Sequence, residues 1–234
     1  MRKTTIILIT LLLGCANGTL PRRPDKTLQL EHLDKNKELG KKILQVARQE
    51  YTFVKDYEVV TLVNKIGGEI VEAIGEDPTT YHFFVIKNNQ INAFAIPGGY
   101  IFIFDGLLKK LDSIDALAGV LAHEIAHVRR NHFFKDARKI GVIDMATMAA
   151  IILAGLAGGD NVATSAVAQA ANITLKLKYS RQNEEEADFF AIKFLQQTQY
   201  DPAGLYDFFK TLALYQRFSF DETIPPYLLT HPEL

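Results

Sequence analysis

One stretch near the middle of the chain constrains the fold more than any other, because its apolar residues recur at every third or fourth position. This spacing predicts an amphipathic α-helix over residues 114–128. The apolar stripe of that helix consists of Ile114, Leu117, Leu121, Ile125 and Val128. The same helix carries His123 and His127, which are four positions apart and therefore about one turn apart. We expect both imidazoles on one face of the helix, directed at one point.

The pair His123 and His127, with Glu124 next to the first of them, is typical of a catalytic zinc site. Zinc lowers the pKa of a water molecule, and a nearby carboxylate can take its proton as the water attacks a peptide carbonyl. The same carboxylate can pass that proton to the leaving amine. The motif predicts one zinc ion per chain, with the two histidines as ligands and Glu124 as catalytic base.

A catalytic zinc ion usually takes three protein ligands, so a third ligand has to come from elsewhere in the chain. His132 is the nearest candidate, five residues after His127. On a continuing helix it would point about 140° away from that ligand, so we interpret it as a packing or surface histidine. His231 is a distant candidate, and it could be a fourth metal contact, a hydrogen-bond donor to the transition state or an unrelated tail residue.

Glu184 is the third candidate, and it lies on a helix predicted over residues 183–197. It would complete a site of two histidines and one glutamate. Asp188 follows one turn later on the same face, where it could accept a hydrogen bond from the far nitrogen of a ligand histidine. Glu185 and Glu186 are interpreted as a solvated acidic run, the usual fate of consecutive glutamates.

The N-terminus has the features of a lipoprotein signal. A charged start precedes an apolar run over residues 6–13, too short to span a bilayer, and Cys15 follows. These features predict a signal peptide over residues 1–14 and a lipid on Cys15 that anchors the chain in a membrane. Ala16 differs from the Asp that retains lipoproteins at the inner membrane. The expected location is the periplasmic face of the outer membrane, with soluble periplasmic or inner-membrane-anchored forms as alternatives.

Composition excludes several classes of protein. Lys and Arg number 26 against 27 Asp and Glu, which argues against a nucleic-acid binder. The single cysteine excludes an intramolecular disulfide and makes a structural zinc site closed by four Cys or His ligands improbable. Residues 145–159 form an uncharged run that is shorter than the roughly 18 residues of a typical membrane span. We predict a buried or interface helix there.

The predicted fold class is α+β and mainly helical, with a small, mostly antiparallel sheet next to the histidine-bearing helix. Residues 15–27 are expected to be a flexible tether, and residues 28–234 a zinc metallopeptidase domain. The predicted strands lie at 81–86, 91–96 and 100–104, and the other helices lie within 28–75 and from Asp201 onward.

Five motifs, in this order and spacing, resemble one known family. They are Asn92-Ala93-Phe94-Ala95 with Pro97-Gly98-Gly99, Gly106-Leu107-Leu108, the segment His123 to His127, Tyr179-Ser180-Arg181 with Glu184 to Asp188, and Thr230-His231-Pro232. The chain resembles the gluzincin metallopeptidases, the family of the CAAX prenyl protease, the peptidase HtpX and the periplasmic peptidases BepA and LoiP. The resemblance runs from about residue 38 to residue 232 and implies a zincin-like fold.

The resemblance implies roles for the matching residues. His123, His127 and Glu184 would bind zinc, Glu124 would be the catalytic base, and Asp188 would support a ligand histidine. His231 would lie near the metal, where it stabilises the oxyanion or occupies the open position.

Asn92, Ala93, Phe94 and Ala95 match an edge strand beside the cleft, and an extended substrate could pair with that strand. The family pattern continues past His231-Pro232 to an arginine, whereas this sequence ends at Leu234. This difference indicates either truncation at the C-terminus or a missing last helix.

The predicted function is zinc-dependent endopeptidase activity on misfolded or misassembled envelope proteins. The alternative is a zinc-containing chaperone or assembly factor of the outer membrane with little proteolysis. The intact Glu124 argues against that alternative, because a pure binder does not need this residue.

Overall fold

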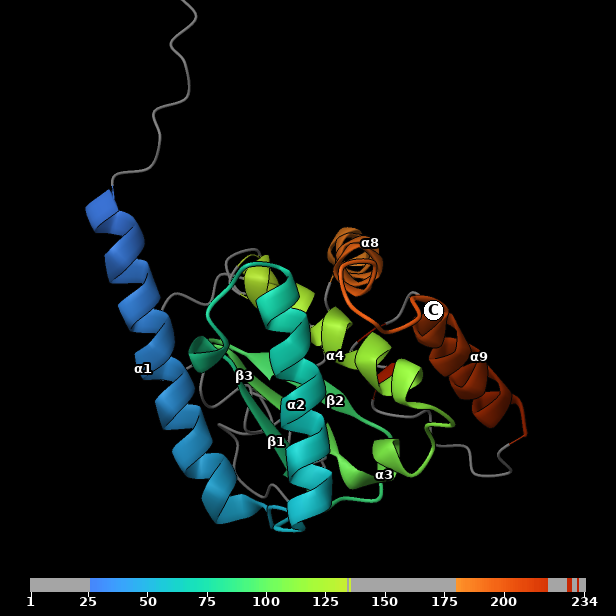
Figure 1. Ribbon diagram of the computed structural model, residues 1–234. Helices are drawn as coiled ribbons and strands as arrows, with labels where there is room; N and C mark the ends of the chain where they lie inside the picture. The colour runs from blue at the N-terminus through green and yellow to red at the C-terminus, as the bar shows by residue number, and fades with distance from the viewer. Residues whose placement is uncertain (1–25, 134, 136–179, 219–226, 229–230, 232–234) are drawn as a thin grey trace, which may run out of the picture.

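The computed structural model in Figure 1 describes residues 26–133, 135, 180–218, 227–228 and 231. The predicted signal peptide, Cys15, nearly all of the tether and the uncharged run 145–159 lie outside these residues. Within the described ranges, no helix combines the length and hydropathy that crossing a membrane requires.

Two helices form the N-terminal part of the domain, α1 (Lys26–Glu50) and α2 (Tyr57–Ala73). Asp56 caps α2, because its carboxylate accepts hydrogen bonds from the backbone amides of Glu58 and Val59 at 3.0 and 3.1 Å. The helical pattern expected for residues 28–75 is thus confirmed as two helices.

The sheet contains β1 (His82–Ile86), β2 (Ala93–Ile96) and β3 (Tyr100–Phe104) in the order β1-β3-β2. β2 and β3 form an antiparallel hairpin, whereas β1 pairs with β3 in parallel. The sheet is therefore mixed, and the expectation of a mostly antiparallel sheet is corrected for the β1–β3 pair. The difference arises because residues 87–92 carry the chain across to the far edge of the sheet. β3 then returns to lie between the two earlier strands.

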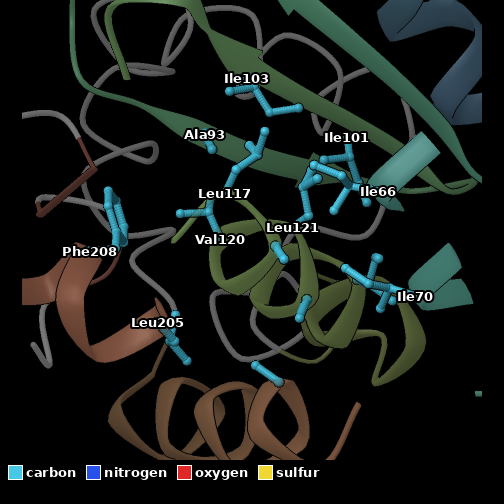
Figure 2. Packing of buried hydrophobic residues seen from close by; sticks show 14 of the residues in the cluster. Ile66, Ile70, Ala93, Ile101, Ile103, Leu117, Val120, Leu121, Leu205 and Phe208 are labelled. Atoms are coloured by element: carbon cyan, nitrogen blue, oxygen red, sulfur yellow. The ribbon is translucent and has the colours of Figure 1, made fainter. Parts of the chain in front are cut away.

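Both faces of the sheet are covered. One face packs against α1, through a cluster of buried residues that includes Leu39, Ile43 and Phe102. The other face packs against α2 and α4 (Ile114–Arg129), so Ile101 and Ile103 of β3 lie in one cluster with Leu117 and Leu121 of α4 (Figure 2). Burial on both faces explains the nearly continuous apolar character of β2 and β3.

The helix α4 lies at the centre of the domain. It begins at the cap Ser113, whose hydroxyl accepts a hydrogen bond from the Ala116 amide at 3.0 Å. It contacts the sheet and α2 as well as α8 (Arg181–Leu195) and α9 (Ala203–Phe218). Gly119 allows close approach of α9, because a Cβ added there would lie 2.7 Å from the Cα of Leu205. This packing buries the histidine-bearing side of α4.

The described residues also include two short elements, the 3-10 helix η1 (Pro78–Thr80) and the helix α3 (Asp105–Leu108). The α+β, mainly helical fold class with a small sheet beside the histidine-bearing helix is confirmed.

Candidate active site

A buried cluster of three histidines and one glutamate joins three distant parts of the chain. One ligand-type atom from each of His123, His127, Glu184 and His231 lies within 4.8 Å of the others. The first two residues come from α4, Glu184 comes from the first turn of α8, and His231 follows the described residues 227–228. These four side chains could hold a single metal ion.

Glu184 and Asp188 contact the α4 histidines from one face of α8. The carboxylate oxygens of Glu184 lie 3.5 Å from Nε2 of His123 and 3.4 Å from Nε2 of His127. Asp188 Oδ1 lies 2.9 Å from the opposite nitrogen of His123, Nδ1. The structure therefore places Glu184 and Asp188, which the sequence predicts on one face of a helix, beside the histidines of α4.

His231 belongs to the same cluster. Its Nδ1 is 2.9 Å from Glu184 Oε2 and 3.2 Å from His123 Nε2, and its Nε2 is 3.6 Å from Glu124 Oε1. Its ring stacks on Tyr227 with centroids 4.4 Å apart. The Tyr227 amide donates to the carbonyl of Ile91 at 3.2 Å, which holds this segment beside the start of β2. The interpretation of His231 as an unrelated tail residue is therefore wrong.

Glu124 is completely buried beside the cluster. Neither of its carboxylate oxygens meets a hydrogen-bond partner among the described residues. Burial raises the pKa of Glu124, and the neighbouring His231 and His123 partly oppose that rise. The backbone of Ala95 in β2 is close enough to lower this pKa as well, so Glu124 lies between α4 and the edge of the sheet.

The charges around the cluster favour a cation at its centre. Burial lowers the pKa of His123, but hydrogen bonds to Asp188 and Glu184 outweigh burial and raise it to about 10. Burial raises the pKa of Glu184, but His231 and His123 outweigh burial and lower it to about 2. Burial, together with the surrounding imidazoles, holds the pKa of His127 well below its usual value. The carboxylates thus stabilise a positive charge at this point, which His123 itself carries when no ion is bound. Glu184 and His127 offer an anionic carboxylate and a neutral imidazole, which are donors suited to a divalent metal ion.

The structure agrees with His132 as a packing histidine but corrects its predicted direction, and it corrects the interpretation of Glu186. His132 is buried, with Nδ1 3.0 Å from His127 Nδ1 and Nε2 2.9 Å from Glu186 Oε2. The 140° estimate fails because α4 ends before His132. Asn131 adopts φ 54°, and this left-handed residue turns the chain back toward His127. Glu186 is therefore a partly buried residue that is paired with His132, Arg130 and Lys135, and not a freely solvated one.

Ala93, Phe94 and Ala95 lie in the edge strand β2, and Asn92 directly precedes that strand. The Phe104 amide donates to the Asn92 carbonyl at 2.9 Å, and Phe94 pairs with Phe102. Because backbone groups alternate in direction along a strand, those of Ala93 and Ala95 face away from β3. Ala95 also lines a shallow pocket with His127, so this edge of the sheet adjoins the cluster.

Comparison with known proteins agrees with this geometry. Residues 61–234 match peptidase family M48. The β-barrel assembly-enhancing protease of Yersinia pestis is 31% identical over 213 residues, which cover 86% of this chain and 42% of the relative. The mitochondrial metalloendopeptidase OMA1 of Schizosaccharomyces pombe is 31% identical over 73% of this chain and 50% of its own length. The metalloprotease LoiP of Escherichia coli is 30% identical over 66% of this chain and 58% of its own length.

The chain spans less than half the length of its β-barrel assembly-enhancing relatives, 42% for the Yersinia protein. The resemblance to the gluzincin peptidases is nevertheless confirmed, because the family match extends over most of the chain. The protein belongs to peptidase family M48.

Proposed function

We propose that this chain is a zinc-dependent endopeptidase that hydrolyses peptide bonds in unfolded or misassembled proteins of the bacterial envelope. The observation that carries the proposal is the buried convergence of His123, His127, Glu184 and His231 next to the buried Glu124. The names of the β-barrel assembly-enhancing relatives support the envelope substrate class.

The residues of the cluster fit zinc, with His123, His127 and Glu184 as ligands. Imidazole nitrogens and a carboxylate oxygen are the usual ligands of a catalytic zinc ion. Glu184 Oε1 is buried and meets no hydrogen-bond partner in the part of the chain that the structure describes, and a cation would satisfy it. His231 is aimed at the same point, because its Nδ1 approaches both Glu184 and His123.

The chain's own residues supply the proton transfers of the proposed reaction. When bound, zinc supplies a Lewis acid that acidifies water and polarises the substrate carbonyl. Glu124, adjacent to His123 and buried, takes the proton of the attacking water and returns it to the leaving amine. Asp188 holds Nδ1 of His123, so that Nε2 of that ring faces the cluster.

The edge strand β2 is the proposed binding surface for substrate, through Asn92, Ala93, Phe94 and Ala95. A segment added to an edge strand is held by backbone hydrogen bonds, which give affinity with little sequence preference. Only an extended, unfolded segment can pair in this way. The proposed substrate class therefore agrees with the position of this edge next to Glu124.

The proposed location is the periplasmic face of the outer membrane, with a lipid on Cys15. The charged start, the apolar run 6–13 and Cys15 support it. Mass spectrometry of the protein from the membrane fraction should find a mature chain that begins at an acylated Cys15. An unmodified Cys15, or cleavage at another residue, would contradict the lipid anchor.

Digestion of casein with and without a metal chelator tests the proposed activity. Casein is an unfolded substrate, and the purified chain should degrade it. Chelation should abolish the digestion, and added zinc should restore it, because chain residues alone do not supply the Lewis acid.

Chelator-resistant digestion would contradict a metal-dependent mechanism. A zinc-loaded protein that suppresses aggregation of an unfolded client without cutting it would favour the alternative, a chaperone or assembly factor.

A further inference from the structure

We propose that His132 and Glu186 are positioning residues that orient His127, so that Nε2 of His127 faces the metal cluster. This inference rests on the proposed zinc site and extends it beyond the ligands. It concerns the side of His127 that faces away from the other ligands.

A continuous line of hydrogen-bond distances leads from His127 to α8. Nδ1 of His127 is 3.0 Å from Nδ1 of His132, and Nε2 of His132 is 2.9 Å from Glu186 Oε2. Both imidazoles are buried, with 2% of His127 and none of His132 exposed. Polar atoms buried to this degree are costly unless they are paired, which favours a defined arrangement of protons along the line.

Glu186 determines the arrangement of protons. A carboxylate only accepts hydrogen bonds, so Nε2 of His132 has to carry a proton. A neutral imidazole carries one ring proton, so Nδ1 of His132 accepts, and Nδ1 of His127 donates to it. The lone pair of His127 is then on Nε2, which lies 2.9 Å from His123 Nε2 and 3.4 Å from Glu184 Oε1. This tautomer is the one that can bind a metal ion in the cluster.

Glu186 is itself held in place by cations. Nε of Arg130 donates to Oε1 at 2.6 Å, and the Lys135 ammonium donates to Oε2 at 3.0 Å. These two contacts hold the carboxylate of Glu186 in place beside Nε2 of His132. The end of Glu186 that faces His132 is therefore a fixed acceptor.

The two α4 histidines are supported in equivalent ways by α8. Asp188 contacts Nδ1 of His123 directly at 2.9 Å, whereas Glu186 reaches Nδ1 of His127 through His132. The turn at Asn131 makes the second connection possible, because it returns the chain to α4. In metal sites, replacing the hydrogen-bond partner of a ligand histidine typically lowers metal affinity or activity by roughly 10- to 100-fold.

Zinc affinity, measured by competition with a chelating dye, tests the proposal on the full chain. His132→Phe removes both hydrogen bonds and keeps a planar ring, and it should weaken zinc binding about 10- to 100-fold. His132→Asn retains an acceptor for His127 Nδ1 and should recover part of that loss. Glu186→Gln should weaken binding less than His132→Phe does, because the amide carbonyl still accepts from His132.

Glu185→Gln is the matched control, because Glu185 is exposed on the same helix and the charge change is the same. It should leave zinc affinity unchanged. The visible absorption spectrum of the cobalt-substituted protein gives a second readout, which should change in His132→Phe and stay the same in Glu185→Gln. Circular dichroism shows whether each variant folds. If His132→Phe does not fold, the zinc affinity and cobalt spectrum of Glu186→Gln decide the test.

The outcomes separate this proposal from the zinc site itself. The positioning role is overturned if the wild-type chain binds zinc and a folded His132→Phe protein has the same zinc affinity and cobalt spectrum. If His132→Phe does not fold, the same result in Glu186→Gln overturns it. In either case the proposed zinc site itself stands. If the wild-type chain binds no zinc, the proposed function fails, and the positioning role fails with it.

Discussion

Replacing Glu124 by glutamine is expected to reduce casein digestion by about 100- to 10,000-fold, the range that general acid–base catalysis typically contributes. Glutamine has nearly the shape of glutamate, so the buried position between α4 and β2 should remain filled. It cannot take a proton from water at neutral pH. Bound zinc, measured by metal analysis, should therefore stay at the wild-type level.

Glu72→Gln provides the control for this prediction, since Glu72 is an exposed glutamate on α2. Its casein digestion and zinc content should both match the wild-type values. Digestion by Glu124→Gln at the wild-type rate would remove Glu124 from the mechanism. Loss of zinc from that variant would instead assign Glu124 to metal binding.

Replacing Glu184 by glutamine is expected to have an equally large effect, by a different route. Glu184 supplies the only carboxylate among the four clustered residues, and it approaches all three histidines of the cluster. Without its charge, zinc affinity should fall by more than the roughly 10- to 100-fold that partners of ligands contribute. Zinc content and casein digestion should be lost together, in contrast to Glu124→Gln.

Glu185→Gln is again the matched control, with the same substitution at the next, exposed position of α8. It should retain zinc and activity. A Glu184→Gln protein that keeps zinc and digests casein would show that the third ligand lies elsewhere, and it would return His132 and His231 to consideration for that role.

The position of α4 and its polar residues follows from the sequence, because helical periodicity is a local property. The spacing of His123 and His127 and the cap at Ser113 both depend on neighbours within one turn. The same reasoning places Glu184 and Asp188 on one face of α8. Their approach to α4 is a tertiary contact, and it was predicted through the family resemblance as well as the spacing.

The role of His132 could not be predicted from periodicity, because the rule of 100° per residue assumes that the helix continues. The helix α4 instead ends at Arg129, Arg130 is its C-cap, and Asn131 has a left-handed backbone conformation. Asparagine after a helix is a known signal for such a turn, and it was the available indication that His132 returns toward His127. Glu186 was missed for a related reason, since its partner Arg130 directly precedes this turn and its partner Lys135 follows it.

The order of the strands was also beyond the reach of local patterns. Strands buried on both faces are apolar throughout, so alternation does not indicate which neighbours pair. The hairpin of β2 and β3 follows from the tight turn at Gly98 and Gly99, where φ is +86° and +85°. The parallel pairing of β1 with β3 depends on where the connection over residues 87–92 crosses, and no local signal specifies that.

Anomalous X-ray diffraction at the zinc absorption edge, from crystals of the purified protein, tests the central claim most directly. One peak is expected per chain, between the imidazoles of His123 and His127 and the carboxylate of Glu184. The density around that peak would also show whether His231 contacts the metal. No peak at this cluster in zinc-supplemented crystals, or a single peak at another site, would contradict the account.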